Sequence, residues 1–190
     1  MAYYDIDAIL LDDQIVPAHF NTAAMDLGVL DPSTPSPHID QGTETDIPLW
    51  LALSLAKRSI VTLRSPSFFG ESFQAHLLAD AQVLNIHDKC PFFYELGVKL
   101  AKLTGNWALP AVLKKAFHTR YLRIVDTSIN LGAADYSEHI RKLTTAERNL
   151  FHLGHAAAAE VLRYKTRDTD RLAASAVVTR KRRRAALGKK

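Results

Sequence analysis

The segment FHTRYLRIVDTSIN, residues 117–130, decides how the fold is interpreted. It places two arginines in a stretch whose apolar residues recur at helical spacing, and the pattern predicts one helix over 107–130. On that helix Asp126 follows Arg123 by three residues, so the two side chains can form an ion pair on one face. We expect the apolar face to be packed, and the charged residues leave three roles open: nucleic-acid binding, catalysis or protein contact.

The same helical spacing extends through most of the chain after Pro66. Helices are predicted at 67–82, 91–103, 107–130 and 136–165. Four such helices form a bundle, and the shorter, mixed pattern before them predicts a small β-rich module. The predicted class is α+β: a β-rich module at 1–64, a mainly α-helical bundle domain at 65–168, and a basic tail at 169–190 that we expect to be disordered.

The N-terminal module contains short elements separated by turn residues. They are a helical turn at Ile6–Leu11, an extended segment at 14–20, a helix at 47–59 and a short strand at 60–64. Pro17 argues against a central strand in the extended segment, because proline cannot donate a ladder hydrogen bond. The prolines, glycine and hydroxyl residues of 32–46 predict an exposed loop.

Composition and charge exclude several classes. With 190 residues and 47% apolar content the chain can bury a core, and it contains no apolar run long enough for a membrane span. The acidic N-terminus is unlike a secretory signal, so we expect a cytosolic or nuclear protein. Seven of the 24 basic residues lie in 180–190, and the rest of the chain is mildly acidic. A nuclear import signal or a disordered basic arm is predicted at Arg180, Lys181, Arg182, Arg183 and Arg184.

Residues that could carry chemistry are few. His152 and His155 have a spacing that can bind one metal ion, but no companion ligand motif accompanies them. The single cysteine, Cys90, is typical of a small core residue. No nucleophile elbow and no glycine-rich phosphate loop is present in the sequence. We expect no enzyme, no cofactor and no metal.

Basic residues on the 107–130 helix support an alternative, direct nucleic-acid binding. The predicted stripe consists of Lys114, Lys115, Arg120 and Arg123, and the basic tail would add a salt-sensitive grip. An arginine paired with Asp126 is less free to contact phosphates. This class therefore ranks second.

Aromatic residues indicate a protein partner instead. Phe92, Phe93 and Tyr94 are consecutive, and three consecutive positions on a helix cannot all face one core. Together with Trp50 and Tyr121 they could form a second buried surface. Basic residues are not interleaved with them, so a base-stacking platform is not favoured.

Four segments in order resemble one family, the third Partner-of-Sld-Five subunit of the GINS replication complex. They are IPLWLA (47–52), VLNIHDKCPFFYELG (83–97), FHTRYLRIVDTSIN (117–130) and ERNLFHLG (147–154). The resemblance implies a β-rich domain before an α-helical one and a heterotetramer of related subunits without catalytic activity. It also implies that the complex joins the MCM ring and a RecJ-like companion in the CMG helicase of eukaryotic forks.

The resemblance makes protein contact the expected role of the candidate residues. Candidate interface or structural residues are Leu49, Trp50, Phe92, Phe93, Tyr94, Arg120, Tyr121, Arg123 and Asp126. We expect Arg120, Arg123 and Asp126 where two subunits meet, paired with each other or with charges opposite. The expected partners are three homologous GINS subunits and, through the complex, the MCM ring and RecJ-like companion. DNA contact is expected to be indirect or weak, membrane contact is not expected, and the expected location is the nucleus.

Overall fold

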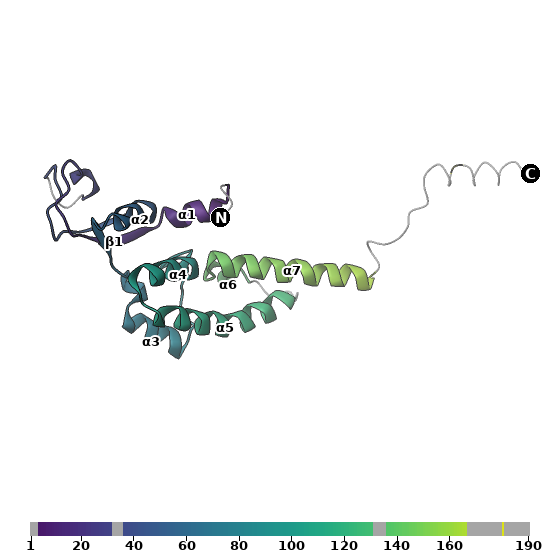
Figure 1. The fold of residues 1–190 in the computed structure, drawn as a ribbon. Helices are drawn as coiled ribbons and strands as arrows, with labels where there is room; N and C mark the ends of the chain where they lie inside the picture. The colour runs from purple at the N-terminus through teal and green to yellow at the C-terminus, as the bar shows by residue number, and fades with distance from the viewer. Residues whose placement is uncertain (1–3, 32–35, 131–135, 167–179, 181–190) are drawn as a thin grey trace, which may run out of the picture.

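A computed structural model describes residues 4–31, 36–130, 136–166 and 180. A small three-stranded antiparallel sheet and two helices lie at one end of the molecule, and longer helices form the rest (Figure 1). The α+β class, with the β-rich part preceding the helical part, is confirmed.

The sheet has the strand order β2-β1-β3. Its strands are β1 (Ile15–Phe20), β2 (Glu44–Pro48) and β3 (Val61–Leu63). Alternate β1 side chains, Val16, Ala18 and Phe20, are buried, as expected for a strand that covers a core with one face. The central position of β1 contradicts the expectation drawn from Pro17.

The register explains why the central strand tolerates Pro17. On the β2 side, Gln14 and Leu49 form a hydrogen-bonded pair, with Leu49 N donating to Gln14 O, and bonded pairs recur at every second residue of β1. Pro17, which lies opposite Asp46, is therefore in a non-bonded pair on that side. The missing N–H therefore faces β3, which ends at Leu63. Only the carbonyl of Pro17 is used there, accepting from Arg64 N at 3.0 Å. One bond at the end of a short edge strand is all that the proline removes.

The predicted exposed loop at 32–46 also differs from the structure. Glu44 begins β2, and Ile39 is only 1% exposed because it forms a bridge with Ala24 through two backbone hydrogen bonds of 2.8 and 2.9 Å. Residues 32–35 lie outside the described part. Proline and hydroxyl composition marked the turns correctly but could not show that an isoleucine between them reaches the core.

Helices begin where capping or a strand end permits. The helix α1 (Ile6–Asp12) is capped by Asp5, whose carboxylate accepts from Ala8 N at 3.4 Å. The helix α2 (Leu49–Lys57) starts directly after β2, later than predicted, because the two preceding residues complete the strand. A short 3-10 turn, η1 (Gly28–Leu30), lies between β1 and β2.

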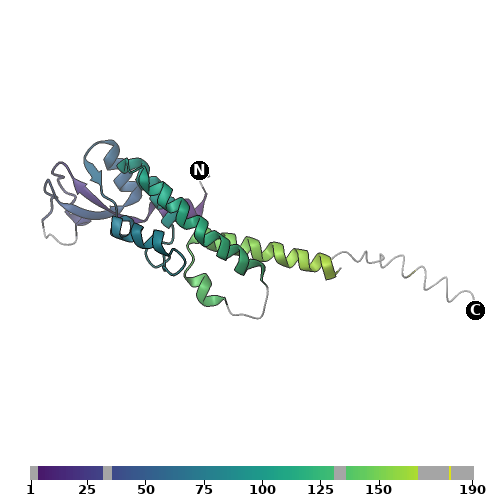
Figure 2. The ribbon, with the colours of Figure 1, turned by 90° about the horizontal axis from the view of Figure 1, so that it is seen from below.

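The remaining described chain is mainly helical, and two of the four predicted helices are each divided. The elements are η2 (Ser67–Phe69), α3 (Glu71–Ala79), α4 (Phe93–Thr104), α5 (Ala108–Ile129), α6 (Ser137–Arg141) and α7 (Thr145–Thr166). The helix expected over 67–82 is η2 and α3, with Gly70 between them. The single helix expected over 136–165 is two helices, α6 and α7. Figure 2 shows α5 and α7 running alongside each other, with α7 extending beyond the end of α5.

One continuous apolar core joins the sheet to α3, α4 and α5. At its centre Phe93 packs against Phe69 and Phe73, with ring centroids 4.8 and 6.0 Å apart. A smaller cluster, Ile124, Leu143 and Phe151, holds α5 to α7. The core therefore crosses residue 64, and the division into 1–64 and 65–168 stays a prediction.

Replacing Phe93 with alanine should destabilise the chain strongly. The ring is 1% exposed, and loss of a core phenylalanine costs about 3–5 kcal/mol through lost burial and the cavity left behind. The free energy of unfolding, measured in a denaturant titration, tests this. Trp107→Ala is the matched control, because Trp107 is 77% exposed and its removal should change that free energy by less than about 0.5 kcal/mol.

Candidate protein-protein interface

A buried ion pair joins α5 to α7. Arg120 and Glu147 are 4% and 0% exposed, and they form two hydrogen bonds, Nε to Oε1 at 2.6 Å and Nη2 to Oε2 at 2.9 Å. The remaining guanidinium donors reach backbone carbonyls: Nη1 donates to Ala81 at 2.6 Å and to Leu84 at 3.0 Å, and Nη2 to Lys142 at 3.4 Å. The charges of Arg120 and Glu147 are thus compensated by each other and by hydrogen bonds within the chain.

The Glu147 carboxylate is satisfied by two further donors. Tyr94 Oη donates to Oε1 at 2.8 Å, and the backbone N–H of Thr144 donates to Oε2 at 3.0 Å. Thr144 Oγ1 in turn accepts from Glu147 N at 3.4 Å, which completes a capping box at the start of α7. This box explains the break between α6 and α7: Thr144 must leave the helix to cap the next one.

The surroundings hold each group in the protonation state that these contacts need. Burial lowers the pKa of Arg120, but the hydrogen bonds with Glu147 and its charge outweigh that effect and raise the pKa overall. Burial raises the pKa of Tyr94, and the charge of Glu147 raises it further, so the hydroxyl stays a donor. The guanidinium of Arg120 is therefore held in its charged form and the phenol of Tyr94 in its neutral form.

The other expected charges on α5 do not join this cluster. Arg123 is exposed and donates to Gln82 Oε1 at 3.3 Å, while Asp126 accepts from Asn130 Nδ2 at 3.2 Å. Within the described ranges no ion pair links Arg123 to Asp126. The charged partner of Arg120 is Glu147, 27 residues away in sequence, so Arg120 stabilises this chain internally and does not lie on the exposed basic stripe.

The three consecutive aromatics also pack within the chain. Phe92 precedes the first turn of α4 and is buried, Phe93 fills the core, and Tyr94 packs edge-on against Phe117 with centroids 5.2 Å apart. The expectation that the three cannot all face one core assumed that all three lie on the helix. Because α4 begins at Phe93, Phe92 is free of that restriction.

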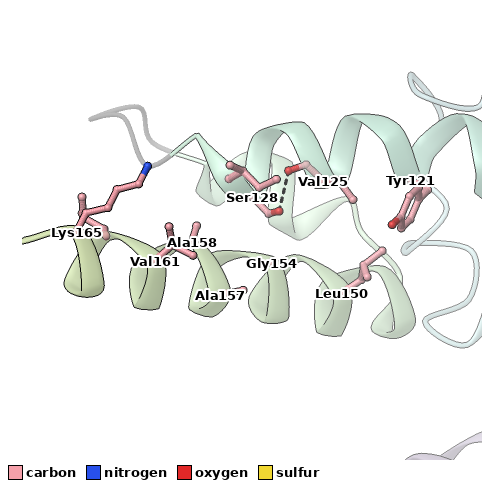
Figure 3. Close-up of a pocket in the computed structure, with 11 residues that line it drawn as sticks. Tyr121, Val125, Ser128, Leu150, Gly154, Ala157, Ala158, Val161 and Lys165 are labelled. Atoms are coloured by element: carbon pink, nitrogen blue, oxygen red, sulfur yellow. Dashed lines mark hydrogen bonds between the residues drawn. The ribbon is translucent and has the colours of Figure 1, made fainter. Parts of the chain in front are cut away.

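The remaining candidates divide between core and surface. Leu49 is fully buried, and Trp50, the next residue of α2, is 53% exposed. Tyr121 lies at one end of an apolar groove between α5 and α7 (Figure 3). Among the predicted import-signal residues only Arg180 is described, and it is exposed. The others, Lys181 to Arg184, lie outside the described residues.

The groove between α5 and α7 has a volume of about 650 Å³. The α5 side provides Tyr121, Val125, Ser128 and Ile129, and the α7 side provides Leu150, Gly154, Ala157, Ala158, Val161, Leu162 and Lys165. The helices come close together at Gly154, where a Cβ atom would lie 2.3 Å from Ser128 Oγ. Small residues on α7 thus keep the groove open to a partner.

Apolar side chains of α7, both in the groove and beside it, are largely exposed. Leu153, Val161, Leu162 and Tyr164 are each more than half exposed. In both ribbon views the last turns of α7 extend past α5 (Figures 1 and 2). A contiguous apolar surface of this kind on a folded chain marks an interaction site.

The described residues show little that could support catalysis. They contain no group of three or more histidine, cysteine, aspartate or glutamate side chains placed to hold a metal ion. His152 and His155 are exposed, and both contact the ring of Phe151. None of the described helices is long and apolar enough to cross a membrane.

Fold and site together define a helical-bundle interaction subunit. Residues 4–57 match the PSF3 N-terminal domain family, and residues 68–164 match the GINS complex protein helical bundle domain family. The chain therefore belongs to the PSF3 family of GINS proteins.

Individual relatives agree over most of the chain. It is 33% identical to the Aspergillus fumigatus "DNA replication complex GINS protein psf3", covering 84% of this chain and 94% of that protein. It is 29% identical to the Mus musculus "DNA replication complex GINS protein PSF3", covering 96% and 88%. Identity to the Dictyostelium discoideum "Probable DNA replication complex GINS protein PSF3" is 30%, over 90% of this chain but 64% of that protein's length.

Sequence reasoning missed Glu147 and the groove. The signal for Glu147 was the Thr144-x-x-Glu147 spacing before an apolar helix, which is a capping box. The apolar faces of the two helices, α5 and α7, were visible in the sequence as apolar residues at helical spacing. Periodicity alone does not show which of these residues are buried in a core and which stay exposed.

Removing the charge of Glu147 should destabilise the fold. Glu147→Gln leaves the buried Arg120 guanidinium without a counter-charge, which costs about 3–5 kcal/mol. In a double-mutant cycle with Arg120→Met, the combined variant should lose markedly less stability than the sum of the single losses. Glu138→Gln, which breaks the exposed ion pair with Lys142, is the control and should have little effect. Additive losses in the cycle would contradict the coupling.

Cys90 should be protected from alkylation. It is buried as expected, and desolvation raises the pKa of its thiol to about 11 from an ordinary 9.0. Iodoacetamide at pH about 8 should label it only after unfolding, because the thiolate is the reactive form. Since the folded pKa is the higher one, the thiol's contribution to stability is complete below pH 9 and is lost as the pH rises towards about 11. Cys90→Ala should remove that part of the pH dependence; rapid labelling of folded protein would refute the assignment.

Proposed function

We propose that this chain is a non-catalytic structural subunit of a heterotetrameric GINS complex, with three homologous subunits as its direct partners. The complex joins the MCM ring and a RecJ-like companion in the CMG helicase and acts in initiation and elongation of eukaryotic DNA replication in the nucleus. Membership of the PSF3 family and the names of the relatives support this function.

The observation that carries the proposal is the uncovered apolar surface of α5 and α7. The groove and the exposed α7 side chains form one face, and nothing in the described part of the chain covers it. Obligate subunit interfaces are apolar in this way, resembling a domain core cut in half. A helix of a sister subunit is the occupant that fits, because ridges of side chains on a third helix can pack between two others.

Direct DNA binding, the second class, receives less support. Arg120 is buried in the internal ion pair and cannot contact phosphates. The remaining basic residues of the stripe on α5 are Lys114, Lys115 and Arg123, which are exposed. The guanidinium of Arg123 already donates to Gln82. Three exposed basic side chains can contact only a few phosphate groups of a nucleic-acid backbone. The expected contribution of the folded part to DNA affinity is small.

Placing a charge in the groove should prevent assembly. In Val161→Arg the guanidinium would have to be desolvated against the mainly apolar lining of the groove when a partner helix docks. Co-expression of this variant with the three sister subunits should give at least about tenfold less tetramer, measured by size-exclusion chromatography with mass detection.

The matched control is Val29→Arg, the same substitution at a side chain that is 96% exposed in η1. It should leave the tetramer yield unchanged. Thermal melting of each isolated chain should be unaffected by both substitutions, which separates assembly from folding. A normal tetramer yield with Val161→Arg would exclude the α5–α7 face as the subunit contact.

A further inference from the structure

A polar pocket of about 450 Å³ lies away from the α5–α7 groove. It is formed by the 85–88 segment between α3 and α4, by α6 and by the first turn of α7. Its back wall adjoins the buried cluster, because Leu84 O and Lys142 O both accept from Arg120. The pocket is therefore attached to the most strongly fixed part of the molecule.

Three of the acidic and basic side chains in this pocket are already engaged. Lys142 Nζ pairs with Glu138 Oε1 at 2.8 Å, and Asn85 Nδ2 donates to Asp88 Oδ2 at 2.7 Å. The other cations, Arg141 and Arg148, have no ion pair with any described residue. The pocket thus has two guanidinium groups available to a ligand.

Two nitrogen atoms beside the pocket lack hydrogen-bond partners. Arg148 Nε and His87 Nδ1 are shielded from solvent, and neither bonds to any described atom. Of these two atoms Arg148 Nε is a fixed N–H donor, whereas Nδ1 of a neutral histidine is a donor in only one tautomer. A shielded N–H without an acceptor is unfavourable, and a charged acceptor is the best remedy for a guanidinium N–H. The arrangement calls for an anionic oxygen.

The charges of the pocket lining favour one kind of anion. The lining has three permanent cations, Arg141, Lys142 and Arg148, against the carboxylates of Asp88 and Glu138, so its net charge suits a single negative charge. A nucleic-acid backbone would bring repeated charges past those two acids. One carboxylate meets a guanidinium through two parallel hydrogen bonds without that repulsion.

We propose that this pocket binds a carboxylate side chain on an acidic peptide segment of a partner protein, with Arg148 and Arg141 as the donors. The binding site is independent of the α5–α7 face and goes beyond subunit assembly. It gives the chain a second contact surface, formed by α6 and the start of α7.

The test is a titration of the full ¹⁵N-labelled chain followed by the arginine Nε–Hε cross-peaks in NMR spectra. The probe is an acetylated, amidated serine-rich peptide with one glutamate, and the matched peptide has glutamine in its place. Addition of the glutamate peptide should move the Arg148 cross-peak saturably, and the glutamine peptide should not. Arg58, exposed at the end of α2, should be unmoved and serves as the internal control.

Variants separate binding from folding. Arg148→Lys identifies the cross-peak, and Arg141→Gln, at an exposed position, should weaken the peptide-induced shift of Arg148 by about tenfold in Kd while leaving the melting temperature unchanged. Arg58→Gln should change neither. Equal shifts with both peptides, no effect of Arg141→Gln, or no movement of Arg148 would overturn the proposal.

Two competing probes distinguish other anions. Inorganic phosphate and a short single-stranded DNA should move the Arg148 cross-peak less, at equal concentration, than the glutamate peptide. Stronger movement with phosphate would assign the pocket to a free anion, and stronger movement with DNA would assign it to nucleic acid. Either result would replace the acidic peptide.

Discussion

The ion pair between Arg120 and Glu147 is the constraint on which the helical part depends. Neither charge can remain alone in the interior without a large loss of stability, so every segment that contributes a contact must be in place together. Those segments are α4 through Tyr94, the turn after α3, the α6–α7 corner and α5. A pair of this kind adds little net stability compared with apolar packing, but it penalises every arrangement in which these four segments are not assembled.

The buried ion pair also affects the exposed face of α5 and α7. Near the pair, α5 and α7 are held together by Ile124, Leu143 and Phe151, and by the close approach at Gly154. Farther along, the same two helices present apolar side chains outward instead of to each other. The part of the docking surface near the ion pair is therefore preorganised, and a partner has to order only the last turns of α7.

The sequence predicted features that depend on neighbouring residues and missed those that depend on distant ones. Helical spacing located α4 and α5 within two residues at each end, whereas each of the other two predicted helices spans two elements, η2 with α3 and α6 with α7. The four family segments identified the class. The partner of Arg120 could not be read from helix spacing, since Asp126 was near in sequence but Glu147 is near in space. Pro17 was misjudged because its cost depends on where the adjacent strand stops. Phe92 was misjudged because one residue decides whether a side chain precedes the helix or belongs to it.

The part of α7 that extends past α5 also has a consequence for how equal amounts of the subunits could be maintained in the cell. Within the described part of the chain the last turns of this helix extend past α5, so an unaccompanied copy would fray there and expose an apolar end that proteases can cleave. Docking would restore the helix and conceal that end. Quality-control proteases would then remove surplus copies and spare those in complexes, which would keep the components of a multi-chain machine in equal numbers.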